Sequence, residues 1–85
     1  MKEWTYQIKD REGIHARPAG LLVKEAARFE SRVTIYKGEK SGDAKRIFAV
    51  MGLGVKCGEE IRVCVEGPDE EQAAQALKEF LQNTL

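Results

Sequence analysis

The sequence predicts an α+β fold in which a four-stranded antiparallel sheet carries helices on one face only. Short segments alternate apolar and polar residues with the period of a half-buried strand, and two longer segments place apolar residues at helical spacing. The alternation leaves one face of the strands polar, which is typical of a sheet covered on a single side. The order is β-α-β-β-(short apolar segment)-β-α within 85 residues, without a repeat or a linker. We therefore expect one domain over residues 1–85.

Four segments predict the strands. Residues 4–8 alternate large apolar with polar side chains, and residues 32–36 repeat this pattern. A turn over residues 37–40 predicts that residues 41–44 form a short returning strand. The alternation is clearest over residues 60–66, where one face holds Ile61, Val63 and Val65 and the other holds Arg62, Cys64 and Glu66.

Two segments have the spacing of helices that bury one stripe of side chains. The first covers residues 16–29, and Pro18 must lie in its first turn, where proline is tolerated. The second covers residues 69–82, where Asp69 followed by Gln72 resembles a capping box. The expected core stripes are Ala19, Leu22, Val23, Ala26 and Phe29 in the first helix, and Ala73, Leu77, Phe80 and Leu81 in the second.

Residues 47–51 form a short apolar segment between the predicted strands. They are compatible with a buried strand or with a single helical turn, and periodicity alone does not decide. The large side chains of Ile47, Phe48 and Met51 either fill the core or contact a partner protein.

The charges cancel in number but not in position. Fourteen Lys and Arg residues balance fourteen Asp and Glu residues, so the formal net charge is zero. Residues 1–58 hold twelve basic and seven acidic side chains, a balance of +5, whereas residues 59–85 hold two and seven, a balance of −5. This asymmetry predicts a basic binding surface in the first part of the chain.

Length and residue types exclude several functions. The chain is too short for a dinucleotide-binding fold, a barrel enzyme or a deep substrate cavity beside a core. One histidine and two cysteines, Cys57 and Cys64, provide neither a zinc site nor a Ser-His-Asp set, so no metal or cofactor is expected and the cysteines have no assigned role. The start of the chain has no signal-peptide pattern, and no segment approaches the roughly 20 apolar residues that span a membrane. We expect a cytoplasmic protein without membrane insertion.

His15 directly precedes the first predicted helix. The start of a helix offers unpaired backbone N–H groups and a partial positive charge, which together bind phosphate or another anion. Histidine is not a favoured capping residue, and the positive helix end favours a neutral, nucleophilic imidazole. Arg17 follows two residues later and can hold an anion through two hydrogen bonds. These features predict a histidine that accepts a phosphoryl group, while an exposed His15 beside a solvated Arg17 is the alternative.

A second stripe lies on the first predicted helix, away from its buried side. It combines cations with one exposed leucine and one glycine that permits close approach. These features indicate a docking surface, although a solvated helix face is the alternative. The residues are Arg17, Gly20, Leu21, Lys24 and Arg28.

The segment Gly13–Ala19, GIHARPA, closely resembles the phosphorylation-site motif of the HPr family, the histidine-containing phosphocarriers of the bacterial phosphoenolpyruvate:sugar phosphotransferase system. The resemblance covers essentially the whole chain, including the Gly52-Leu53-Gly54 turn and residues 66–70. It implies an open-faced β-sandwich, in which four antiparallel strands are covered on one side by three helices. Residues 47–51 are then the short second helix.

The resemblance also implies roles for individual residues. In the family, the histidine matching His15 takes a phosphoryl group on Nδ1 from phosphorylated enzyme I and passes it to sugar-specific enzyme IIA domains. Ala16 and Arg17 would bind the phosphate. The protein would be a carrier rather than a stand-alone catalyst, and we expect a monomer with enzyme I, enzyme IIA and regulatory proteins as candidate partners. The implied docking surface comprises Gly20, Leu21, Lys24, Phe48 and Met51, to which we add the neighbouring Lys45, Arg46 and Ile47.

One position departs from the family pattern. Many Gram-positive members carry a regulatory serine just before the short helix, which HPr kinase phosphorylates from ATP. This chain has Arg46 there, which offers no hydroxyl, so no regulatory serine is expected and Ser41 is not assigned that role.

Two other functions are compatible with the sequence. A regulatory module of the same fold would use phosphorylation of His15 to control a partner protein instead of sugar transport. A nucleic-acid-binding domain would suit the basic first 58 residues, but no strand shows the paired exposed aromatic residues on which bases stack. We therefore expect no nucleic-acid partner.

Overall fold

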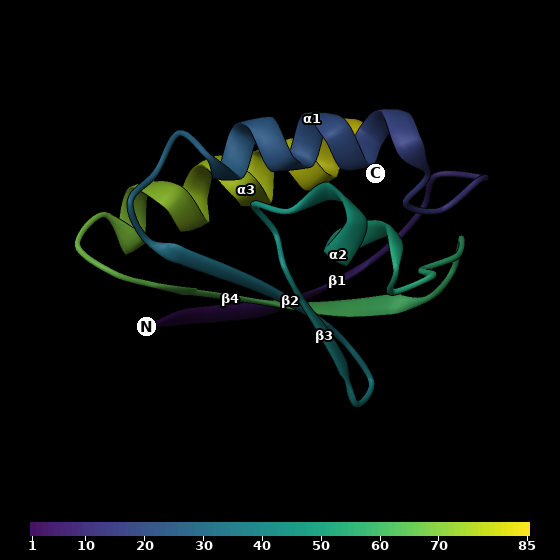
Figure 1. Ribbon diagram of the computed structural model, residues 1–85, viewed down its shortest axis with the longest axis horizontal. Coiled ribbons are helices and arrows are strands. Elements are labelled where there is room, and N and C mark those ends of the chain that lie inside the picture. The colour runs from purple at the N-terminus through teal and green to yellow at the C-terminus, as the bar shows by residue number, and fades with distance from the viewer.

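The computed structural model describes all 85 residues and places the helices on one side of a single sheet (Figure 1). This arrangement is the open-faced α+β sandwich that the sequence predicts. The elements in chain order are β1 (Lys2–Gln7), α1 (Ala16–Ala26), β2 (Arg32–Lys37), β3 (Lys40–Asp43), α2 (Ile47–Met51), β4 (Glu60–Glu66) and α3 (Glu70–Thr84).

All neighbouring strands of the sheet are antiparallel, in the order β1-β4-β2-β3. Val63 of β4 lies opposite Trp4 of β1 on one side and Ile35 of β2 on the other. Because side chains alternate along a strand, this register gathers the apolar positions of the three strands on the face that the helices cover. The opposite face carries the polar positions, as the alternation predicts.

The core lies between the sheet and the helices as one cluster of 19 buried apolar residues. The strands supply branched side chains and the two long helices supply alanine and leucine, so the helix backbones lie close to the sheet. The predicted stripes enter this core, although Val23, Phe29 and Phe80 are only partly buried. No helix of the structure is long and apolar enough to cross a lipid bilayer.

The first helix ends three residues earlier than predicted, at Ala26. After it, the amides of Arg28 and Phe29 donate to carbonyls three residues back, Glu25 and Ala26, each at 3.2 Å. Such bonds tighten the last turn and end the α-helix. Phe29 nevertheless packs against the core, which is why its spacing resembled a helical position.

The short apolar segment Ile47–Met51 is a helix, as the family resemblance implied. The strand bounds differ slightly from those predicted. β3 begins at Lys40, because a two-residue turn pairs Lys40 directly with Lys37. β1 begins at Lys2, which pairs with Val65 of the long strand β4.

The prediction of a capping box at the start of α3 is wrong. The Asp69 side chain makes no hydrogen bond to its own helix. Its carboxylate instead accepts hydrogen bonds from the amides of Glu30 and Ser31, each at 2.9 Å, and from the Ser31 hydroxyl. Asp69 therefore joins the start of α3 to the turn that follows α1.

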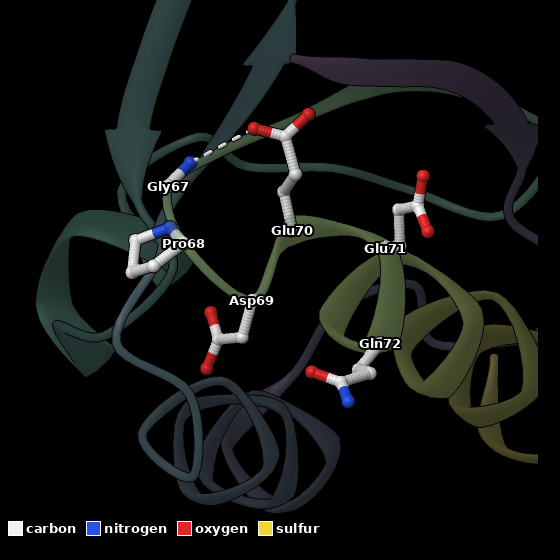
Figure 2. A pocket seen from close by; sticks show the side chains of 6 residues that line it. All are labelled: Gly67, Pro68, Asp69, Glu70, Glu71 and Gln72. Carbon is white, nitrogen blue, oxygen red and sulfur yellow. Dashed lines mark hydrogen bonds between the residues drawn. The ribbon is translucent and has the colours of Figure 1, made fainter.

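The turn between β4 and α3 is shaped for this link. Gly67 has φ +153°, and a Cβ atom there would lie 2.6 Å from the Ser31 Cα, so only glycine fits. The Gly67 amide donates to the Glu70 carboxylate at 3.1 Å, while Asp69 points to the other side of the turn (Figure 2). The two adjacent carboxylates thus bind different parts of the chain.

Replacing Asp69 by asparagine is expected to destabilise the protein near neutral pH and to matter less in acid. The hydrogen bond from the Ser31 hydroxyl, followed by that from the Glu30 amide, lowers the pKa of Asp69 from its ordinary value of 3.8. A lowered folded-state pKa contributes stability that is present above the unfolded pKa and is lost as the pH falls through the folded one. Urea unfolding from pH 7 to pH 2.5 measures this difference between the wild type and Asp69→Asn.

The matched control is Glu39→Gln, which removes an exposed carboxylate in the β2–β3 turn that has no ion pair. Its free energy of unfolding should follow the wild type at every pH. A constant difference between wild type and Asp69→Asn across the whole pH range would contradict the assigned role of the Asp69 charge.

Candidate functional site

His15 is the N-cap residue of α1, with φ −95° and ψ −176°. Its carbonyl accepts the first helical hydrogen bond, from the Ala19 amide at 2.9 Å, but its side chain makes no capping bond. The imidazole is 35% exposed. The backbone of this residue therefore starts the helix, while its ring remains available for chemistry.

The loop before His15 is held by a close approach to another loop. Gly13 has φ +71°, and a Cβ atom there would lie 2.2 Å from the Val55 oxygen. The next residue, Ile14, is buried and donates its amide to the same Val55 oxygen at 3.0 Å. These contacts fix the point at which α1 begins.

The first turn of α1 presents backbone donors that no protein group uses. The amides of Ala16 and Arg17 have no acceptor within the chain, and Pro18 has no amide hydrogen. The first amide committed to the helix is that of Ala19. Two N–H groups and the positive helix end therefore accompany the imidazole, which is the arrangement that binds anions.

Two carboxylates lie beside the ring. His15 Nε2 is 3.6 Å from Asp10 Oδ1 and 3.6 Å from Glu12 Oε2. Both distances exceed that of a hydrogen bond, so the contacts are electrostatic. The sequence interpretation considered the positive end of the helix but not these two negative charges beside the ring.

Neither Asp10 nor Glu12 stood out in the sequence, because a carboxylate in a surface loop is ordinarily solvated. The sequence feature that could have indicated their position is the turn over residues 10–13, in which an aspartate is followed three residues later by a glycine. Asp10 Oδ1 accepts the Glu12 amide at 2.9 Å, and the Asp10 carbonyl accepts the Gly13 amide at 3.0 Å. This turn returns both carboxylates toward His15.

The Arg17 side chain is exposed and makes no hydrogen bond or ion pair with the protein. It lies in the first turn of α1, two residues beyond His15. A guanidinium without an internal partner can bind an anion through two parallel N–H bonds.

Helices α1 and α2 pack against each other (Figure 1), and one point of contact is at Gly20, five residues beyond His15. A Cβ atom on Gly20 would lie 3.7 Å from Ile47 Cδ1, an ordinary contact distance. Three large apolar side chains are exposed on the two helices: Leu21 by 46%, Phe48 by 85% and Met51 by 37%. We call the set Gly20, Leu21, Lys24, Ile47, Phe48 and Met51 the α1–α2 surface.

The predicted cations divide into two groups. Lys24 and Arg46 are exposed and make no hydrogen bond or ion pair, and Arg46 is the N-cap of α2. Lys45 instead donates its Nζ to the Phe29 carbonyl at 2.7 Å, and Arg28 pairs with Glu25 at 2.9 Å. The ammonium of Lys45 thus holds the turn after α1 rather than facing outward with the α1–α2 surface.

The two cysteines lie apart and unbridged. Cys57 is exposed, with Sγ 3.7 Å from the Lys9 carbonyl, and Cys64 is on the polar face of the sheet. No three His, Cys, Asp or Glu side chains are placed to hold a metal ion.

The chain matches a family of known proteins over nearly its full length. The family described as "PTS HPr component phosphorylation site" matches residues 2–83. A phosphocarrier protein HPr of Mycoplasma capricolum is 43% identical over 84 residues, which are 99% of this chain and 94% of that protein.

The chain belongs to the HPr family.

Solved structures of HPr agree with this assignment. The histidine-containing phosphocarrier protein of Mycoplasma has a TM-score of 0.94 and 42% identity, covering 98% of this chain and 94% of that one. HPr of Thermoanaerobacter tengcongensis has also been solved as a dimer, with a TM-score of 0.77, 42% identity and coverage of 98% and 95%.

HPr-like segments also occur inside larger proteins. In Vibrio cholerae, a multiphosphoryl transfer protein is 42% identical over 76 residues, which are 86% of this chain but 19% of that protein. As an HPr, the chain is a phosphocarrier of the phosphotransferase system and not a stand-alone catalyst.

Replacing Gly13 by alanine is expected to lower the free energy of unfolding by about 2–5 kcal/mol. A left-handed backbone costs an L-residue about 1–2 kcal/mol, and forcing a methyl group against Val55 adds about 1–3 kcal/mol. Urea unfolding measures the loss. Gly38→Ala is the matched control, because φ is +59° there and nothing lies within 4 Å of the added Cβ. Equal losses in the two variants would show that the Val55 contact adds nothing.

Proposed function

We propose that His15 carries the phosphoryl group of this HPr, accepting it on Nδ1 from phosphorylated enzyme I and donating it to sugar-specific enzyme IIA domains. The observation that carries the proposal is the position of His15 at the start of α1, with its backbone in the helix and its ring in no capping bond. A helix cap chosen for stability alone would be serine, threonine, aspartate or asparagine.

The surrounding donors support this role. The amides of Ala16 and Arg17 and the Arg17 guanidinium are all without protein partners, and together they can bind the oxygens of a phosphoryl group. The Nδ1 lone pair forms the new bond to phosphorus as the bond between phosphorus and the donor group of enzyme I breaks, and the donor group leaves with that electron pair. Transfer to an enzyme IIA repeats the step with this histidine as the leaving group.

The α1–α2 surface is the proposed docking site for both partners. It borders the His15 helix start, so a partner seated there can present its own phosphorylated or accepting side chain to the imidazole. Exposed apolar side chains provide the contact area, while Arg17, Lys24 and Arg46 favour acidic partners. A carrier that serves two partners in turn suits a small interface and fast dissociation.

Three further expectations belong to this proposal. The carrier acts in the cytoplasm, as a single domain over residues 1–85, and as a monomer. Arg46 replaces the serine that HPr kinase modifies in many relatives, so that route of regulation is absent.

The assignment of His15 is tested by incubating the protein with phosphoenolpyruvate and enzyme I. We expect one phosphoryl group by intact mass, stable in alkali and lost in acid, and no adduct in His15→Ala. Arg17→Lys should still be phosphorylated, but more slowly, because an ammonium ion cannot bind the phosphoryl group through two parallel bonds. An adduct that survives in His15→Ala would overturn the site.

The same assay separates the carrier from a regulatory module. Addition of an enzyme IIA domain should move the phosphoryl group off His15 and onto that domain. Phosphorylation of His15 without onward transfer to any enzyme IIA domain of the source organism would favour the regulatory module.

The docking role of the α1–α2 surface is tested with two variants, of which one should stabilise the protein and the other should leave its stability unchanged. Gly20→Ala should raise the free energy of unfolding by about 0.5–1 kcal/mol, because alanine is the better helix former and its Cβ meets Ile47 at an ordinary distance. Phe48→Ala should leave stability unchanged, since that side chain is 85% exposed. Both should slow phosphoryl transfer, Phe48→Ala by about tenfold in kcat/KM.

The control is Gln75→Ala, an exposed position on α3 away from this surface. It should transfer at the wild-type rate. Wild-type transfer rates in Phe48→Ala with both enzyme I and an enzyme IIA domain would contradict the docking assignment. If Gly20→Ala transfers the phosphoryl group more slowly while its free energy of unfolding is higher, unfolding cannot be the cause of the slower transfer.

A further inference from the structure

We propose that the carboxylates of Asp10 and Glu12 direct phosphorylation to Nδ1 of His15 by occupying the Nε2 side of its ring. This inference rests on the proposed function, because it concerns which atom of His15 accepts the phosphoryl group. It assigns the two acidic residues as positioning residues for the reaction.

The carboxylates are placed by the backbone rather than by chance contact. Asp10 is held by a turn in which its Oδ1 accepts the Glu12 amide and its carbonyl accepts the Gly13 amide. The Asp10 amide donates to the Leu85 carbonyl at 3.0 Å, which anchors the turn to the end of α3. Both carboxylates reach the same ring atom, Nε2, at 3.6 Å.

Negative charge at Nε2 has two effects on the ring. A neutral imidazole carries one proton, and nearby carboxylates favour the form with that proton on Nε2. The lone pair then resides on Nδ1. The same charges repel an incoming phosphoryl group, which is an anion, from the Nε2 side, and at such short range this repulsion is only partly screened by salt.

The other charged groups near the ring do not cancel this effect. Arg11 lies around the same open hollow as Asp10, Glu12 and His15, so one cation faces two carboxylates there. On the helix side, the partnerless amides of Ala16 and Arg17 attract an anion. Nδ1 is bonded to Cγ and is therefore the ring nitrogen nearer to the backbone of His15, the residue that starts the helix. Repulsion of the phosphoryl group at Nε2 and its attraction to the helix start both favour phosphorylation on Nδ1.

The proposed step is balanced without another group. The Nδ1 lone pair forms the bond to phosphorus as the bond between phosphorus and the donor breaks, and the donor leaves with that electron pair. The Nε2 proton stays on the ring, whose positive charge is then offset by the carboxylates. In the onward step the P–Nδ1 electron pair returns to Nδ1 and the ring leaves as neutral imidazole.

Phosphoramidate is the probe that tests this proposal, because it phosphorylates histidine without enzyme I and releases ammonia. NMR of the product distinguishes phosphate on Nδ1 from phosphate on Nε2. We expect the wild type to favour Nδ1. Glu12→Gln should lower the ratio of Nδ1 to Nε2 product by about two- to fivefold, the range that exposed charge contacts produce. Asp10→Asn combined with Glu12→Gln should lower it further.

These substitutions preserve the fold of the loop. Asparagine at position 10 keeps the oxygen that accepts the Glu12 amide, and the Glu12 side chain is 75% exposed. Glu39→Gln is the matched control, since it removes the same charge from the distant β2–β3 turn and should keep the wild-type ratio. A ratio unchanged in the double variant, or changed equally in Glu39→Gln, would overturn the proposal.

A second measurement needs no phosphorylation. Long-range 1H–15N spectra of the neutral ring report which nitrogen carries the proton, and the share with the proton on Nε2 should fall in the double variant but not in Glu39→Gln. An unchanged share would contradict the proposal.

Failure of this proposal and failure of the proposed function give different results. If the protein accepts no phosphoryl group from enzyme I but still reacts with phosphoramidate mainly on Nδ1, only the proposed function is contradicted.

Discussion

The backbone of Gly13 passes so close to the Val55 carbonyl that a residue with a side chain does not fit at position 13. Ile14 then donates its amide to the same oxygen. This contact joins two surface loops and fixes the direction in which the chain enters α1. The position of His15 at the N-cap follows from it, as do the free amides of Ala16 and Arg17. Every chemical property of the site depends on where that helix begins, because the partial charge of a helix is concentrated in its first turn.

The start of α1 lacks the side-chain capping bond that would stabilise the helix. An aspartate or serine in place of His15 would stabilise the helix by about 1 kcal/mol through a capping bond. The structure instead leaves the first-turn amides without internal acceptors and places an imidazole beside them. Stability is supplied elsewhere, where Asp69 binds the turn after α1 and Lys45 binds the Phe29 carbonyl in the same turn. Both ends of α1 are thus fixed, one by tertiary hydrogen bonds and the other by a close backbone approach.

The positively charged side chains fall into two groups, those bound within the fold and those without a partner. Several cations of the first 58 residues are bound to other groups of the protein. Arg28 pairs with Glu25, and Lys37 pairs with Glu59. Lys45 donates a hydrogen bond to the Phe29 carbonyl. The cations that remain without partners around the α1–α2 surface are Arg17, Lys24 and Arg46. A net charge of zero therefore coexists with a locally basic α1–α2 surface, and the number of cations in the sequence overstates how many lack a partner within the protein.

The sequence by itself determined the fold class, the burial pattern of the strands and the placement of His15 and Arg17 at a helix start. Periods of two and 3.6 residues, the restriction on Pro18 and the residue types of the motif are all local properties. Only the tertiary structure decided that α1 ends at Ala26, that Asp69 binds Ser31 instead of capping its own helix, and that Asp10 and Glu12 face Nε2 of His15. Each of these features depends on segments that are distant in sequence. A side chain bonds to whichever group the folded chain places next to it. The turn that carries the two carboxylates, for example, is held by hydrogen bonds to the carbonyls of Val55 and Leu85.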